Sequence, residues 1–243
     1  MPPDLSYLTT PAAPWLSILF IGTTVLTAAL LVRAVQRAGI GTTPWLLGIG
    51  LWLTLQAIVA RTGFYQQLQA LPPRIVLFGI GPTVLVILYL LLSRRGRELT
   101  SRLSPASLTG LSVVRVPVEI GLYALAGQYL VPELMTFAGR NFDILAGLTA
   151  PLVAYAYARG RLGRRGMVAW HLAALALLLN IVVLALLAAP TPLQQLAFEQ
   201  PNVAVVRFPF VWLPVFIVPV VAFTHLVVLR RLLTHPYPRG LTT

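Results

Sequence analysis

The sequence predicts an all-α polytopic membrane protein, a seven-helix transmembrane bundle that forms one domain over residues 1–243. Hydrophobic residues make up 58% of the chain and charged residues 10%, whereas a soluble domain carries about 25% charged residues. Seven apolar runs also come close to the roughly 20 residues that a helix needs to cross the hydrocarbon core. The runs are Pro14–Val32, Thr43–Ala60, Ile75–Ser93, Leu108–Val131, Phe142–Ala158, Met167–Ala189 and Phe208–Leu229.

The continuity of these runs favours helices, because the strands of a membrane barrel alternate in segments of about ten residues. Asp4 precedes the first run and no Lys or Arg does, which disfavours a cleavable signal peptide with a basic n-region. We therefore expect the first run to be retained as a span. The fifth run is the weakest of the seven because it is short and begins next to Asp143.

The distribution of arginine predicts the orientation of the bundle. All 18 basic residues are Arg, and the segments after the first, third, fifth and seventh runs hold 13 of them with Glu98 as their only acid. The charges of the remaining segments sum to zero: Arg61, Arg74, Arg140 and Arg207 against Asp4, Glu133, Asp143 and Glu199. Positive charge concentrates in cytoplasmic loops, so we expect the N-terminus outside and the C-terminus in the cytoplasm. The net charge of +12 then indicates topology and contact with anionic lipid headgroups rather than nucleic-acid binding.

The fourth run, GLSVVRVPVEIGLYALAG, carries two charges that share a helical face. Arg115 and Glu119 are four residues apart, so they are able to pair, and Pro117 between them removes a backbone hydrogen bond. Glu119 is expected near the middle of the membrane, with Arg115 about 6 Å closer to the cytoplasm. Two interpretations stay open, an internal ion pair or a carboxylate that faces a cavity for proton exchange or ligand binding. In both, the two side chains are buried in the bundle.

Two histidines lie at nearly equal depth in the sixth and seventh runs. Because imidazole suits haem iron and other metals, His171 and His225 are candidate ligands of a b-type haem. The alternative is that each is a hydrogen-bonded residue near a helix end. Asn180 lies on a different face from His171, where we expect it to bond a neighbouring helix.

The seventh run contains Pro209, Pro214 and Pro219 at intervals of five residues. Each proline removes one backbone hydrogen bond, so this helix is expected to be kinked or locally opened. A static bend and a gating role are both compatible with the spacing.

The stretch MTFAGRNFDI, residues 135–144, is the most polar segment between the fourth and fifth runs. Helix capping by Asn141 or Asp143 is one explanation, with Gly139 in the turn. Capping needs a single short polar residue, however, and this segment supplies several. We therefore predict that it closes an outward-facing polar pocket, with Phe137 and Phe142 drawing it into the mouth of the bundle near Gln56 and Arg61. The residues predicted to line the pocket are Arg115, Glu119, Glu133, Arg140, Asn141, Asp143 and Arg207.

The sequence lacks the residues that several kinds of chemistry require. The chain has no cysteine, so disulfides, thiol nucleophiles, iron–sulfur clusters and cysteine zinc sites are excluded. It has no lysine either, which excludes the retinal Schiff base of the seven-helix microbial rhodopsins. No nucleophile elbow, Walker loop or HExxH motif is present, which disfavours an enzyme.

The segments RVPVEIGLYALAGQYLVPELMTFAGRNFDILAG and LAFEQPNVAVVRFPFVWLPVFIVPVV resemble uncharacterised seven-span inner-membrane proteins of bacteria. The resemblance covers roughly residues 112–230 and carries no established activity. It implies a bacterial inner-membrane location and a shared site around GRNFD and the FEQPN loop.

These observations predict a multi-pass membrane protein whose outward-facing pocket binds a small or lipid-like ligand for transport, sensing or binding. Two alternatives remain open. One is a membrane-embedded enzyme or a b-type haem electron-transfer protein that uses His171 and His225. The other is a structural subunit of a larger membrane complex.

Overall fold

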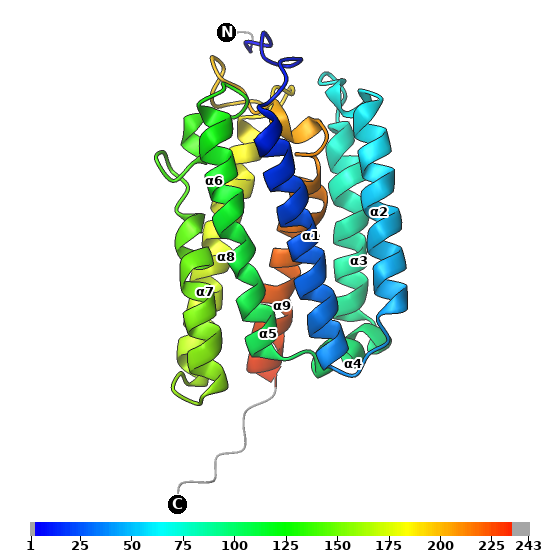
Figure 1. Cartoon of the computed structure of the whole chain (residues 1–243), viewed down its shortest axis with the longest axis vertical. Helices are drawn as coiled ribbons and strands as arrows, with labels where there is room; N and C mark the ends of the chain where they lie inside the picture. Colours follow the sequence, from blue (N-terminus) through cyan, green and yellow to red (C-terminus); the bar gives the residue numbers. More distant parts are fainter. Residues whose placement is uncertain (1–2, 235–243) are drawn as a thin grey trace, which may run out of the picture.

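The structure is a computed structural model that describes residues 3–234 (Figure 1), so that Arg239 lies outside the described residues. Every regular element in this range is helical. The α-helices are α1 (Pro14–Arg37), α2 (Thr43–Arg61), α3 (Gly81–Leu92), α4 (Arg94–Arg102), α5 (Pro105–Leu111), α6 (Arg115–Ala126), α7 (Asp143–Ala158), α8 (Arg164–Leu187) and α9 (Val218–Thr234). The 3-10 turns are η1 (Phe64–Gln66), η3 (Ser112–Val114), η4 (Glu133–Met135) and η5 (Ala204–Val206), and the π-helices are η2 (Val76–Ile80) and η6 (Leu213–Ile217).

Within residues 3–234, five helical segments are long and apolar enough to cross a membrane. They are α1, α2, the α5–η3–α6 segment Pro105–Ala126, α8, and the η6–α9 segment Leu213–Thr234. The segment Val76–Leu92 passes the same test together with α4, from which it is bent by 83°, and α7 is a shorter apolar helix. Each of the seven predicted runs overlaps one of these segments, although the fourth was predicted to end at Val131 and its helix ends at Ala126.

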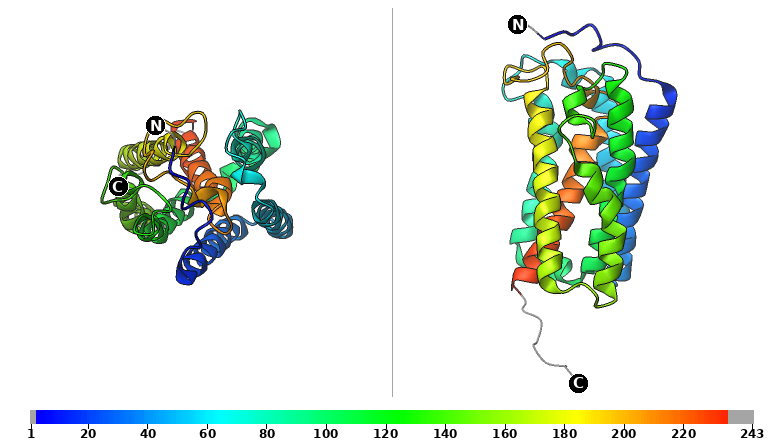
Figure 2. Two further views of the ribbon diagram at one scale, coloured as in Figure 1. Left: turned by 90° about the horizontal axis from the view of Figure 1, so that it is seen from above. Right: turned by 90° about the vertical axis from the view of Figure 1, so that its left-hand side faces the viewer.

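The helices lie side by side along one long axis, with the first described residues and the end of α9 at opposite ends of the bundle (Figures 1 and 2). The α9 helix packs against α3, α4, α5 and α8 and is buried along most of its length. The α2 helix lies at the periphery, where only Gln56 and Ala60 are buried.

The bend between α3 and α4 follows from composition. The sequence of α4, RRGRELTSR, is too polar to enter hydrocarbon, so the chain turns by 83° where the apolar run ends. Ser93 has an extended backbone and caps α4, its Oγ accepting from Gly96 N at 3.0 Å. The helix thus lies across the end of the bundle (Figure 1).

The predicted opening of the proline-rich last helix is confirmed. The helix begins at Leu213, five residues later than expected, and its first five residues form the π-helix η6. The carbonyl oxygen of Val215 accepts hydrogen bonds from Trp52 Nε1 at 3.1 Å and Thr83 Oγ1 at 3.0 Å. Side chains of α2 and α3 therefore use a backbone acceptor of η6.

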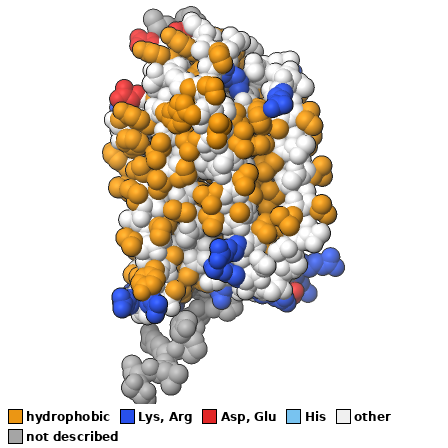
Figure 3. All heavy atoms as spheres, in the orientation of Figure 1, with side chains coloured by type: hydrophobic (Ala, Val, Ile, Leu, Met, Phe, Trp, Pro, Cys, Tyr) orange, Lys and Arg blue, Asp and Glu red, His pale blue; other side chains and the backbone are white. Residues whose placement is uncertain are grey.

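Charge is segregated between the ends of the molecule. Figure 3 shows an apolar band around the middle, with most arginine side chains of this face near its lower end and the carboxylates mainly near its upper end. The lower end is the one that holds the α1–α2 and α7–α8 loops and α4 (Figure 1). An apolar band between two polar ends is the surface that a bilayer-spanning bundle requires.

Candidate functional site

One face of the α5–η3–α6 segment carries a row of buried polar side chains. Thr109, Ser112, Arg115 and Glu119 follow each other at intervals of three, three and four residues, which places them on one helical face. Their exposed fractions are 0%, 0%, 2% and 1%, respectively. At 1.5 Å per residue this row extends for about 15 Å along the bundle. The prediction that Arg115 and Glu119 are buried is confirmed.

Arg115 is the centre of the row, and it pairs with a different carboxylate from the one expected. Its NH1 lies 2.6 Å from Asp143 Oδ1 and also donates to the carbonyl of Ala174 at 3.0 Å. Its NH2 lies 2.6 Å from His225 Nε2. The expected ion pair between Arg115 and Glu119 is not formed, because the guanidinium extends across the bundle to α7, α8 and α9. The Arg115–Asp143 pair is the only salt bridge within residues 3–234.

Asn141 joins Glu119 to the start of α7. Its Nδ2 donates to Glu119 Oε1 at 2.7 Å and to the carbonyl of Met135 at 3.0 Å. Its Oδ1 accepts from the backbone N–H of Asp143 at 3.1 Å. Asn141 therefore satisfies an orphan N–H at the helix start, as a capping residue does, and also contacts a buried carboxylate.

The two histidines extend the row toward the arginine-rich end. His225 Nδ1 lies 2.7 Å from His171 Nδ1, and His171 Nε2 lies 3.0 Å from Thr109 Oγ1. Arg115 can only donate, so His225 Nε2 accepts and its Nδ1 carries the proton. His171 Nδ1 must then accept, which leaves the proton on Nε2 to be donated to Thr109. The Thr109 hydroxyl in turn donates to the carbonyl of Pro105 at 2.8 Å.

This geometry does not fit the alternative in which the two histidines are axial ligands of one haem. Two axial histidines stand on opposite faces of a porphyrin, whereas the imidazoles of His171 and His225 are in direct contact, with ring centroids 4.8 Å apart. Both are fully buried and hydrogen-bonded, as the alternative interpretation expected. The histidines therefore belong to the hydrogen-bonded row.

The contacts make one continuous network, which we call the polar column. Its members are Thr109, Arg115, Glu119, Asn141, Asp143, His171 and His225. Ser112 Oγ, Arg115 Nε and Glu119 Oε2 lie on the same face, are buried, and have no hydrogen-bond partner. Leaving such atoms unpaired is costly, so their concentration here marks the column as a functional candidate.

The other predicted site residues lie outside the column. Glu133 and Arg140 are exposed, although the backbone carbonyl of Arg140 accepts from Asn180 at 2.9 Å. Arg207 is half-buried and donates to the carbonyl of Thr10 at 2.6 Å. Burial lowers the pKa of Arg207 from its ordinary value. These three side chains are not brought together with the column.

Several expected neighbours of the 135–144 segment also lie elsewhere. Gln56 is buried against Tyr65 and the carbonyl of Phe78, and Arg61 stacks over Phe208. Phe142 is 52% exposed, and Phe137, 37% exposed, stacks on exposed Tyr123 rather than entering the bundle. The segment is therefore anchored by buried side chains, Asn141 and Asp143 among them, and neither phenylalanine ring is buried.

The FEQPN loop, residues 198–202, connects the ends of two helices through side-chain hydrogen bonds. Gln200 Nε2 donates to the carbonyls of Ala126 and Val131, and Asn202 Nδ2 donates to the carbonyl of Ala185. These bonds tie the ends of α6 and α8 to the loop. None of these three bonds reaches a residue of the polar column.

Sequence reasoning missed two members of the row and all contacts between distant helices. Thr109 and Ser112 share the spacing that pointed to Arg115 and Glu119, so extending this pattern toward the N-terminus would have found them. The contact of Arg115 with His225 joins residues 110 positions apart, and no local pattern indicates it.

The fold and the column define a class, a helical protein with several helices long enough to cross a membrane and a polar network in its interior. The chain belongs to the family DUF8737, a domain of unknown function, whose model matches residues 72–233. The match contains every member of the polar column. No curated protein and no solved structure matches the chain.

Proposed function

We propose that the chain is a multi-pass membrane protein of the transport class that moves protons through its interior along the polar column. The observation that carries this proposal is the series of contacts from Glu119 to Thr109, in which Asn141 joins Glu119 to the backbone N–H of Asp143. From the Asp143 carboxylate the series continues through side chains, those of Arg115, His225, His171 and Thr109. Chains of Asp, Glu and His within membrane helices are typical of proton relays. The column combines two carboxylates with two imidazoles, and both kinds of group exchange protons.

Arg115 divides the column into an outer carboxylate half and an inner histidine half. A proton bound at His225 Nε2 would remove the lone pair that Arg115 NH2 contacts at 2.6 Å and would place two positive groups together. A proton bound at Asp143 would remove the negative partner of NH1. A proton bound at His225 or at Asp143 therefore changes a contact of Arg115. In this proposal, displacement of Arg115 is the step that controls proton transfer between the two halves.

The proposal includes seven spans with the N-terminus outside, in the inner membrane of a bacterium. The arginines of α4 and of the α7–α8 loop support it, since such residues favour the cytoplasmic side. The two carboxylates, Glu119 and Asp143, then form the outer half together with Asn141. Asn141 and Asp143 belong to the 133–143 segment, and Glu119 lies beneath it. An outward-facing ligand pocket that includes Glu133, Arg140 and Arg207 has less support, because these side chains lie apart from the column.

Cysteine accessibility tests the orientation, since the chain contains no cysteine of its own. Ser101→Cys in α4 and Arg161→Cys in the α7–α8 loop are expected to react with an impermeant maleimide only after the cells are opened. Gln69→Cys, between α2 and α3, is expected to react in intact cells. Labelling of Ser101→Cys or Arg161→Cys from outside would contradict the proposed orientation.

The proposed transport is tested by proton flux into vesicles. Purified protein in liposomes that contain a pH-sensitive dye is given a potassium diffusion potential, and internal acidification is measured. Wild-type vesicles are expected to acidify faster than protein-free vesicles, and Glu119→Gln is expected to lower the added rate at least tenfold. Gln keeps the acceptor that Asn141 uses but cannot exchange a proton.

Glu133→Gln is the matched control, because Glu133 is an exposed carboxylate at the same end of the bundle. It is expected to leave the flux unchanged. The proposal fails if wild-type vesicles acidify no faster than empty ones. It also fails if Glu119→Gln conducts like wild type.

A further inference from the structure

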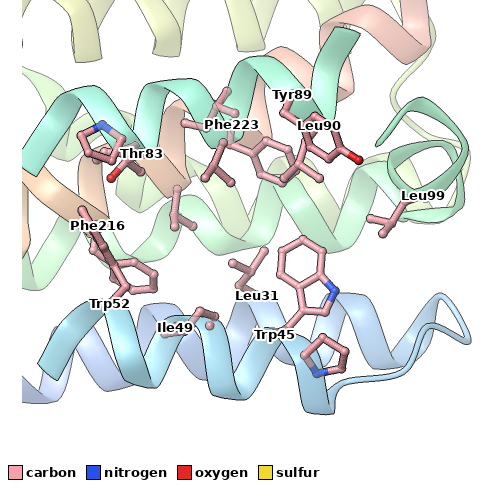
Figure 4. Close-up of a pocket in the computed structure, with 17 residues that line it drawn as sticks. Leu31, Trp45, Ile49, Trp52, Thr83, Tyr89, Leu90, Leu99, Phe216 and Phe223 are labelled. Carbon is pink, nitrogen blue, oxygen red and sulfur yellow. The ribbon is translucent and has the colours of Figure 1, made fainter. Parts of the chain in front are cut away.

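A second feature lies on the far side of α9 from the polar column. It is an apolar cavity of about 530 Å³ between α2, α3 and α9, with α1 and α4 at its margins (Figure 4). Its walls include Trp45, Ile49 and Trp52 of α2, Leu90 of α3, and Phe216 and Phe223. Its volume falls within the range of about 300–1,000 Å³ typical of small-molecule sites. None of the column residues lines it.

The cavity is elongated along the helices. It follows α2 from Trp45 to Trp52, about 10 Å at 1.5 Å per residue. The outer surface of α2 is apolar and uncovered, with Leu47 69% and Leu51 74% exposed. Because α2 is apolar both toward the cavity and toward the outside, both of its surfaces suit contact with hydrocarbon chains.

The two ends of the cavity differ in polarity. Figure 4 shows the ring nitrogen of Trp45 and the hydroxyl of Tyr89 on the side that faces Leu99 of α4. Neither group has a hydrogen-bond partner within residues 3–234, and Tyr89 is 56% exposed. Tyr and Trp at such a position supply donors at the level of lipid headgroups.

Two cations flank the same end. Arg95 and Arg102 are four residues before and three residues after Leu99, so they share its face of α4. Both are exposed and form no ion pair within the described range, although Glu98 lies on the same helix. Arg97 and Arg230 at this end are engaged with the carbonyls of Leu92 and Leu91. Two guanidinium groups without an ion pair in this range, on the helix whose Leu99 lines one end of the apolar cavity, are complementary to a phosphate joined to a hydrocarbon chain.

We propose that this cavity binds one acyl chain of an anionic phospholipid, with the lipid phosphate held by Arg95 and Arg102 at the α4 end. Trp45 and Tyr89 contact the glycerol region, and Phe216 and Trp52 close the other end around the chain. The site is independent of proton transfer, since it shares no residue with the polar column.

Native mass spectrometry of the purified full chain titrated with phosphatidylglycerol or phosphatidylcholine tests the site. Wild type is expected to retain one phosphatidylglycerol with at least tenfold preference over phosphatidylcholine. Gly48→Trp fills the cavity, because Gly48 lines it and a Cβ there would meet nothing within 4 Å. This change is expected to lower the affinity for phosphatidylglycerol at least tenfold.

Leu51→Trp is the matched control, because it adds the same ring to the exposed outer surface of α2 and is expected to bind like wild type. The double change Arg95→Gln and Arg102→Gln is expected to remove the preference for phosphatidylglycerol. The same pair of changes at Arg161 and Arg165 is expected to keep it. Equal binding by Gly48→Trp and Leu51→Trp would overturn the proposal. A preference for phosphatidylglycerol that survives the loss of Arg95 and Arg102 would also overturn it. So would a mass spectrum in which the protein carries a second copy of itself instead of lipid.

Discussion

Replacement of Asp143 with alanine is expected to destabilise the protein by about 3–5 kcal/mol, the cost of removing one partner of a buried ion pair. Asp143 is 4% exposed and holds Arg115 at 2.6 Å. Without it the guanidinium keeps the carbonyl of Ala174 and the imidazole of His225 as its hydrogen-bond partners, and neither of them carries a negative charge. Reversible unfolding of the purified protein in mixed micelles measures the change in free energy.

Two further variants separate the loss of the pair from general damage to the helix start. Glu133→Ala removes an exposed carboxylate from the same end of the bundle and is expected to change the stability by less than about 0.5 kcal/mol. The double change Arg115→Met and Asp143→Leu removes both charges and is expected to recover most of the stability, because apolar residues of similar volume often replace a buried pair at little cost. A loss below about 1 kcal/mol for Asp143→Ala would show that the pair is not buried as described.

The length and composition of the apolar runs were sufficient to predict an all-helical chain. A helix in hydrocarbon must satisfy its own backbone, so the spans are encoded locally. The last helix shows where this reasoning loses precision. The phenylalanines and tryptophan of the segment FPFVW are as apolar as the helix that follows, so hydropathy placed the start at Phe208 rather than Leu213. The proline spacing nevertheless predicted the opening that η6 provides.

Most residues of the polar column were predictable from the sequence, with Thr109 as the exception, but their pairing was not. The high cost of burying charge identified Arg115, Glu119 and Asp143 without any structure. Helical spacing favoured Glu119 as the partner of Arg115, yet a guanidinium on a long side chain can reach a carboxylate on a neighbouring helix. The choice of Asp143 depends on how α7 packs against α6, which is a tertiary property. The same limit applies to the histidines, whose equal depth was predicted and whose contact was not.

The conformation of the 133–141 segment explains how Asn141 reaches Glu119. The backbone N–H of Thr136 donates to the carbonyl of Glu133 at 2.8 Å, and the N–H groups of Gly139 and Asn141 both donate to the carbonyl of Thr136, at 2.9 and 3.1 Å. The chain is therefore wound back on itself before α7 begins. A Cβ at Gly139 would lie 2.6 Å from Leu134 Cα and would overlap the carbonyl of Glu133. Only glycine fits this approach of backbone to backbone.

Gly139→Ala is accordingly expected to destabilise the protein by roughly 2–3 kcal/mol, the upper part of the range for overpacking. The contacts involve backbone atoms, which cannot rotate away as a side chain can, so the segment must unwind and withdraw Asn141 from Glu119. The proton flux is expected to fall together with the stability. Gly163→Ala in the α7–α8 loop is the control, since a Cβ there meets nothing within 4 Å and its φ of −78° suits any residue. Wild-type stability and flux in Gly139→Ala would mean that the segment does not position Asn141, and that Glu119 is held by other means.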